Sequence, residues 1–205
     1  PEGNVLAGAG RKVTLDLGGP VKLEVTQGAL NTLIEQNGAI RADGGRVYLT
    51  TKAAGDLASS VINHTGVTEA KTLATGKKGE VILLGDMAKG TLNVSGKITA
   101  DAPQGGNGGF IETSAAHVDI AEGTHISASA PYGLGGEWLI DPFDYIINSV
   151  AAGNIAGTLN TGTNVTVTTT ADTSSLGSTG GGSNGNIKVA SAIEKTAGGA
   201  ATGSG

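Results

Sequence analysis

The chain has 205 residues, of which 36 are glycine, 15% are charged and 3% are aromatic, and its net charge is −5. The acidic balance, the lack of a Lys/Arg stripe and the scarcity of aromatic side chains argue against nucleic-acid binding. The absence of cysteine excludes disulfides and thiolate chemistry. No apolar run approaches the roughly 20 residues that a membrane helix needs, so we expect no membrane insertion.

Short strands separated by turns are predicted along the chain, because Val, Ile, Leu, Thr and Ala alternate between glycine-rich segments. The first strands lie around Val5, at 13–17 and at 21–25. Four similar stretches follow, which start at Leu33, Val61, Leu92 and Val118. Each contains an apolar strand, a glycine, a second strand ending in Ala, a turn, another glycine and a third strand. Strands continue less regularly after Tyr145, and residues 170–186 predict a Gly/Ser-rich protruding loop.

The spacing of these repeats predicts how they stack. The central glycines are 28, 30 and 27 residues apart, at Gly38, Gly66, Gly96 and Gly123. Two residues beyond each second glycine comes an apolar position, occupied by Val47, Val81, Ile111 and Trp138. The next inward position holds Leu49, Leu83, Thr113 and Ile140. Apolar spacing of two indicates strands, and three strands in each repeat of about 30 residues predict a three-sided parallel β-helix.

We therefore expect an all-β chain, a parallel β-helix of about six or seven coils with a less regular C-terminal part. Regular coils are predicted for residues 1–145, and coils that continue around the protruding loop for residues 146–205. The chain is expected to be a fragment of a longer protein. The glycine-rich run at 105–109 is predicted to be a corner, because a phosphate-binding loop needs a following Lys-Ser/Thr, and Phe110 follows instead.

Several motifs resemble one known family. The stretches "GAIRADGGRVYLTTKAAGDLASSVINHTGVTEAKT", "GGNGGFIETSAAHVDIAEG" and "GEWLIDPFDYII" are similar to the β-helical region of two-partner secretion exoproteins, the filamentous-haemagglutinin-like adhesins of Gram-negative bacteria. The resemblance covers roughly residues 3 to 195. The secretion domain of that family, expected to carry an "NPNGI"-like motif, is missing here. The chain therefore resembles the shaft that follows the secretion domain.

This resemblance implies a right-handed β-helix and a function. Family members cross the outer membrane unfolded through a β-barrel secretion partner and fold at the cell surface, where they serve in attachment, biofilm matrix or toxin delivery. The resemblance therefore implies a secreted protein, extracellular or on the outer-membrane surface of a Gram-negative bacterium. The zero cysteine count fits such export, because a periplasmic disulfide would trap a chain that must thread a pore.

No catalytic, cofactor or metal site is predicted. Asp141 and Asp144 are the nearest approach to a carboxylate pair, but an Asp before proline more often starts a turn. The three histidines are expected to face solvent or lie in turns, and Trp138 is expected in the core. An extra residue near His125 is expected to form a β-bulge. Tyr48, on an outward strand position, and Tyr132, in a corner, are the candidate surface contacts for a glycan.

The function expected from the sequence is that of a structural shaft segment of a large secreted adhesin. One alternative is a carbohydrate-binding β-helix module that recognises an exopolysaccharide or host glycan, and another is the stalk of a contact-dependent toxin-delivery protein. An enzyme is the least favoured class. The bare strand edges at the ends of the solenoid are expected to promote end-to-end self-association.

Overall fold

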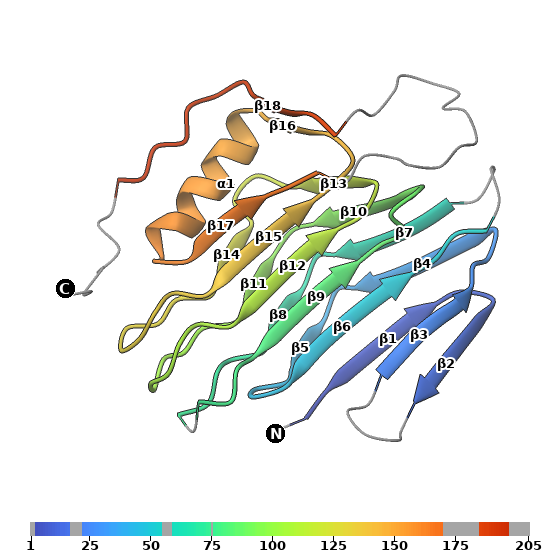
Figure 1. The fold of residues 1–205 in the computed structure, drawn as a ribbon, viewed down its shortest axis with the longest axis horizontal. Coiled ribbons are helices and arrows are strands. Elements are labelled where there is room, and N and C mark those ends of the chain that lie inside the picture. The colour runs from blue at the N-terminus through green and yellow to red at the C-terminus, as the bar shows by residue number, and fades with distance from the viewer. Residues whose placement is uncertain (1–2, 17–21, 55–58, 75, 170–184, 197–205) are drawn as a thin grey trace.

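The computed structural model describes residues 3–16, 22–54, 59–74, 76–169 and 185–196. Most of its strands form three parallel sheets (Figure 1). The six-stranded sheet contains β1 (Val5–Ala9), β6 (Arg46–Thr51), β9 (Glu80–Leu84), β12 (Phe110–Ser114), β15 (Glu137–Asp141) and β17 (Asn164–Val167). The β4–β13 sheet contains β4 (Asn31–Gln36), β7 (Ser59–His64), β10 (Gly90–Val94) and β13 (His117–Ile120). The β5–β14 sheet contains β5 (Ala39–Arg41), β8 (Val67–Glu69), β11 (Lys97–Thr99) and β14 (His125–Ser127).

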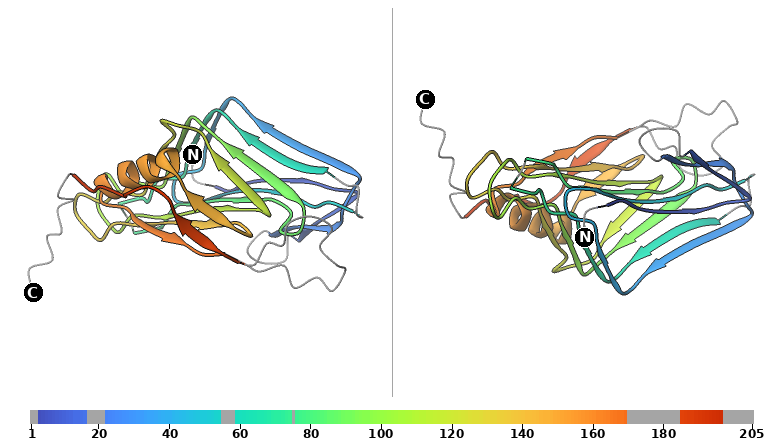
Figure 2. Two further views of the ribbon diagram at one scale, coloured as in Figure 1. Left: turned by 90° about the horizontal axis from the view of Figure 1, so that it is seen from above. Right: turned by 90° about the horizontal axis from the view of Figure 1, so that it is seen from below.

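The chain visits the three sheets in a fixed order, which defines a turn. Strands β4, β5 and β6 form one turn, and the order repeats through β7–β9, β10–β12 and β13–β15. Viewed from above and below, successive turns lie side by side along the molecule (Figure 2). The structure is thus a parallel β-solenoid of about four turns, which confirms the predicted parallel β-helix architecture.

The interior contains in-register columns of apolar side chains. Val47 of β6 pairs with Val81, which pairs with Ile111, which pairs with Trp138. The second predicted column also forms, through the partners Leu49, Leu83, Thr113 and Ile140. Every residue of both columns is at most 2% exposed, as expected for alternate residues that point inward from a strand. Because the columns continue across turns, each turn completes the burial of its neighbours' apolar residues.

Glycine occupies the corners where turns approach most closely. A Cβ atom at Gly109 would overlap the carbonyl oxygen of Gly79, and one at Gly136 would overlap that of Gly109. These glycines are therefore required by close backbone contact between turns, which confirms that the 105–109 run is a corner.

The bulge expected near His125 is absent. Strand β14 pairs with β11 in continuous register, with Lys97 opposite His125 and Ile98 opposite Ile126. The extra residue lies instead in the turn before β14, where Thr124 is buried and its hydroxyl donates to the carbonyl of Ala121 at 2.6 Å. The turn absorbs the insertion because the strand register is fixed by the interior column.

A helix that the sequence analysis did not predict follows the fourth turn. Helix α1 (Ser149–Asn160) lies between β16 (Tyr145–Ile147) and β17, in a segment for which the sequence predicted only that the coils continue. The side chain of Asn148 caps it by accepting the Ala151 N–H at 3.0 Å. The helix packs against the end of the solenoid through buried residues that include Ala151, Ala152, Asn154 and Ile155. The strands expected after Tyr145 form as well, so the chain is mostly strands, with this one helix as the exception to the all-β expectation.

The two ends of the solenoid have further additions. At the first end, β2 (Lys12–Asp16) and β3 (Lys22–Gln27) form an antiparallel hairpin, and Leu23 of β3 lies against Gly8 of β1. At the other end, β16 pairs in parallel with β18 (Ile187–Val189). The protruding loop expected at 170–186 lies outside the described residues, except for its last two.

Two glycines of α1 have no packing role within the described chain. Gly153 and Gly157 are exposed, and a Cβ at either position would meet no atom within 4 Å. We expect Gly153→Ala and Gly157→Ala each to raise the free energy of unfolding by about 0.5–1 kcal/mol, because alanine loses less backbone entropy in a helix. Urea unfolding followed by circular dichroism measures the change.

Gly109→Ala is the matched control for this prediction. Its added methyl group would overlap the Gly79 carbonyl oxygen, so the same substitution should destabilise the protein there. If Gly153→Ala and Gly157→Ala destabilised the protein as Gly109→Ala does, the conclusion that these two helical positions have room for a methyl group would be wrong.

Candidate functional site

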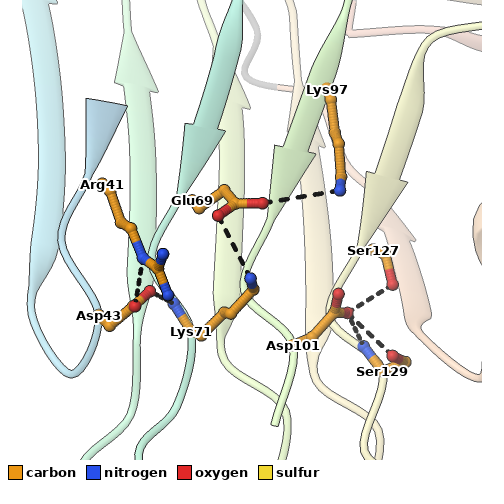
Figure 3. Close-up of polar contacts among 8 residues, drawn as sticks. All are labelled: Arg41, Asp43, Glu69, Lys71, Lys97, Asp101, Ser127 and Ser129. Carbon is orange, nitrogen blue, oxygen red and sulfur yellow. Dashed lines mark hydrogen bonds and ion pairs between the residues drawn. The ribbon is translucent and has the colours of Figure 1, made fainter. Parts of the chain in front are cut away.

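The outer face of the β5–β14 sheet has a cluster of charged and hydroxyl side chains linked by ion pairs and hydrogen bonds. Ile98 and its partners Thr68 and Ile126 point into the core, so alternate residues point outward. Polar residues continue past the ends of the strands along the same face (Figure 3). We call this group the polar ladder, and it contains Arg41, Asp43, Glu69, Lys71, Lys97, Asp101, Ser127 and Ser129.

Positive and negative groups in the polar ladder are paired with one another. The Arg41 guanidinium donates from Nε to Asp43 Oδ2 at 2.6 Å. Glu69 lies between two lysines, at 3.2 Å from Lys71 Nζ and 3.6 Å from Lys97 Nζ (Figure 3). Pairs this exposed contribute at most about 1 kcal/mol each. The face is therefore charge-balanced, and its cations are engaged within the chain.

The aspartates of the polar ladder link one turn to the next. Asp43 Oδ1 accepts the backbone N–H of Lys71 at 3.1 Å, and Asp101 Oδ1 accepts that of Ser129 at 2.7 Å. Both links join residues 28 apart, which is one turn of the solenoid. The hydroxyls of Ser127 and Ser129 also donate to Asp101 Oδ1.

Hydrogen bonding also explains the acidity of Asp43. Burial alone would raise the pKa of this carboxyl, but the bonds from Arg41 and from the Lys71 N–H, with the two nearby positive charges, lower it overall. Asp43 therefore remains a charged acceptor, which suits a carboxylate that holds the backbone of the next turn.

Similar links occur at corners outside the polar ladder. The side-chain oxygen of Asn4 accepts the Arg46 N–H at 2.9 Å, and that of Asn107 accepts the Leu134 N–H at 3.0 Å. In each case a short polar side chain satisfies a backbone donor outside the strand ladder. The polar ladder thus belongs to a wider set of cross-links between turns.

One histidine differs from its predicted position. His64 is 0% exposed, with Nδ1 2.9 Å from the Ser95 carbonyl oxygen and Nε2 2.9 Å from the Thr68 hydroxyl. The expectation that it faces solvent or lies in a turn is wrong, because alternation along β7 points it inward with Ile62. Burial lowers the pKa of His64, so the ring is held neutral between two hydrogen-bond partners.

The predicted glycan contacts lie apart from the polar ladder and from each other. Tyr48 is half-buried on the outer face of the six-stranded sheet, in the first of the four turns. Tyr132 is 77% exposed in the segment between β14 and β15, in the fourth turn. Trp138 is in the core as predicted, where its Nε1 donates to the Thr113 hydroxyl at 3.1 Å.

The described residues include no group of three or more His, Asp or Glu side chains placed to hold a metal ion. In the same part of the chain, no helix has the length and apolar character required to cross a membrane. No family model, curated protein or solved structure matches the chain. Its function therefore has to be inferred from the geometry of the molecule and from its sequence motifs.

The polar ladder has a sequence signal that the sequence analysis missed. The second strand of each repeat ends in Ala, and the residue after that Ala is Asp43, Lys71, Asp101 or Ser129. A polar residue at the same place in four repeats predicts a row of polar side chains along one corner. The pairing partners could not be predicted, because the turns that follow differ in length.

We expect Asp101→Ala to lower the free energy of unfolding by about 2 kcal/mol, because three donors lose a charged acceptor. Urea unfolding measures the change. Glu122→Ala is the control, since Glu122 is an exposed carboxylate in the next turn of the solenoid, between β13 and β14. Equal, small effects of the two substitutions would contradict a linking role for Asp101.

The buried His64 predicts a loss of stability in acid. In the unfolded chain the ring takes up a proton near its ordinary pKa of 6.5, whereas the folded protein resists protonation to lower pH. The contribution of His64 to the free energy of unfolding is therefore fully present well above pH 6.5. It is lost as the pH falls from about 6.5 to the lowered pKa of the folded protein. Between pH 7.5 and 5.5 the contribution of His64 should fall by up to about 1.4 kcal/mol.

Urea unfolding of the wild type and His64→Gln at both pH values isolates this contribution. His117→Gln serves as the control, because His117 is an exposed histidine on β13 of the same sheet. An identical pH dependence in all three proteins would show that His64 does not resist protonation.

Proposed function

We propose that this chain is a structural shaft segment of a large secreted adhesin on the surface of a Gram-negative bacterium. The observation that carries the proposal is the continuity of the solenoid: interior columns and backbone ladders run unbroken through four turns. The similarity of its motifs to filamentous-haemagglutinin-like exoproteins also supports this function.

The polar ladder supports a mechanical function over a ligand-binding one. Its ion pairs lie within the chain, and its aspartates accept backbone donors of the next turn. A face built to bind a charged ligand would instead direct its charges outward. Cross-links between turns add resistance to separation of neighbouring turns, as a shaft requires.

The proposal includes a right-handed coil and six or seven turns when partial turns are counted. Strand β1 precedes the four turns in the six-stranded sheet, and β17 follows them in the same sheet. Beyond β17, β18 pairs with β16 as the start of another turn. Right-handed winding is an expectation from the resemblance to the two-partner secretion family.

Export through an outer-membrane β-barrel partner is part of the same proposal, and the absence of cysteine supports it. End-to-end self-association is a further expectation. In the described structure β4 and β5 each have one partner strand, so one edge of each is unpaired, whereas the β2–β3 hairpin packs against β1. The stalk of a toxin-delivery protein would need the same shaft.

Single-molecule pulling between the chain ends tests the proposal. A mechanical shaft should unfold in discrete force peaks. Each turn of about 28 residues should release roughly 95 Å of extended chain. Val81→Asp places a charge in a position that is 0% exposed, so this variant should lose the peaks of the central turns. Smooth extension of the wild type at low force, without peaks, would refute the shaft function.

A further inference from the structure

A groove of about 320 Å³ lies on the outer face of the six-stranded sheet, where β12 and β15 begin. Its apolar part includes the ring of Phe110, which is half-buried. Polar side chains surround this ring, and they belong to Lys78, Glu80, Asn107, Glu137 and Asn164. A groove with one aromatic surface and a few polar groups around it is typical of a site for a small polar ligand.

Strand register places these side chains in a row. Glu80 pairs with Phe110, Phe110 pairs with Glu137, and Glu137 pairs with Asn164. All four point outward, because their neighbours Val81, Ile111 and Trp138 point into the core. With strands about 4.8 Å apart, the row is roughly 14 Å long and runs in the direction in which the turns stack.

The side chains of Glu80, Glu137 and Asn164 are each held by one hydrogen-bonding atom, which leaves another atom of each open to the groove. Glu137 Oε1 accepts the Thr166 hydroxyl at 2.7 Å, and Arg46 Nε donates to Glu80 Oε2 at 2.6 Å. Asn164 donates through Nδ2 to the carbonyl of Gly136 at 3.1 Å. The second carboxylate oxygens and the Asn164 Oδ1 atom have no partner among the described residues and are available as acceptors.

The floor of the groove is backbone that has no room for larger side chains. Gly108, Gly109, Gly135 and Gly136 line it, and a Cβ at any of them would overlap a carbonyl oxygen of a neighbouring segment. Substitution cannot fill this floor without separating the turns. The groove is therefore a fixed consequence of how the turns pack, and it exists before any ligand arrives.

We propose that this groove binds a neutral oligosaccharide, with one pyranose ring on Phe110 and its hydroxyl groups donating to Glu80, Glu137 and Asn164. Sugar hydroxyls supply the donors that these acceptors require, and the C–H face of a pyranose ring fits an aromatic surface. The row favours a linear chain that lies along the solenoid. The proposal is independent of the shaft function.

Other ligand classes fit the groove less well. A peptide that binds as an added strand needs a free sheet edge, but β9, β12 and β15 each have a partner on both sides. A polyanion would meet two carboxylates and a single lysine at the groove, so repulsion disfavours it.

Calorimetric titration with maltohexaose, cellohexaose and chitohexaose tests the proposal, with heparin as the anionic comparison. At least one neutral hexasaccharide should bind saturably, and heparin should not bind. Phe110→Ala should weaken that binding tenfold or more, and Glu137→Gln about fivefold. Glu112→Gln is the matched control, since Glu112 lies on the same outer face but outside the groove, and it should leave the affinity unchanged. Circular dichroism confirms that each variant is folded.

Several outcomes would overturn the proposal. These are no binding of any of the three hexasaccharides at millimolar concentration, or binding that survives Phe110→Ala in the folded protein. Binding that Tyr132→Ala abolishes while Phe110→Ala does not would place the glycan site at the exposed tyrosine instead. Single-molecule pulling measures only the resistance of the turns to unfolding. A lack of oligosaccharide binding in the titration would therefore refute the glycan site and leave the shaft function standing.

Discussion

The in-register stacking of one turn on the next is the interaction on which the rest of this structure depends. A parallel strand has side chains with a period of two, so a shift by one residue would turn every interior side chain to solvent. The columns that contain Val81 and Leu83 would both be lost by such a shift. Register is therefore fixed by burial in the interior, and the corners have to adapt to it.

The corners show how this adaptation works. Turns of different length bring different backbone groups to the surface, and donors outside the strand ladder need acceptors. Short polar side chains such as Asp43, Asp101 and Asn107 supply those acceptors across turns. Where backbones come closest, glycine removes the side chain altogether. The need for the corners to fit a fixed strand register thus produces polar cross-links at some corners and pairs of glycines at others.

Much of the interior was predictable from sequence, because burial requires an apolar residue at every second position of a strand, whichever apolar residue each repeat uses. The column of Val47, Val81, Ile111 and Trp138 could be aligned from the spacing of glycines alone, despite its change from small to large side chains. Tyr48 and Trp138 were assigned correctly to outer and inner positions for the same reason.

Features that depend on a single contact could not be predicted in this way. The sequence of α1 contains two glycines and no charged residue, so it lacks the pattern of a stable helix. What holds it is tertiary packing: Asn154 donates from Nδ2 to the carbonyl of Ala121 at 3.0 Å, while Ile155 is buried against the core. His64 was misplaced even though the alternation that points Ile62 inward applies to it, because an ionisable ring is expected in a core only where both of its nitrogens have partners, and the sequence does not show those partners.

The solenoid also restricts where recognition can occur. Its interior is filled and most strands of the central turns are paired on both sides, so neither cavities nor strand addition are available along the middle of the molecule. Only outward side chains remain, and strand register arranges them in rows. The polar ladder uses its row for contacts within the chain, whereas the row at Phe110 keeps acceptors directed outward. Two rows of one rigid scaffold can therefore differ in function while they share the same backbone geometry.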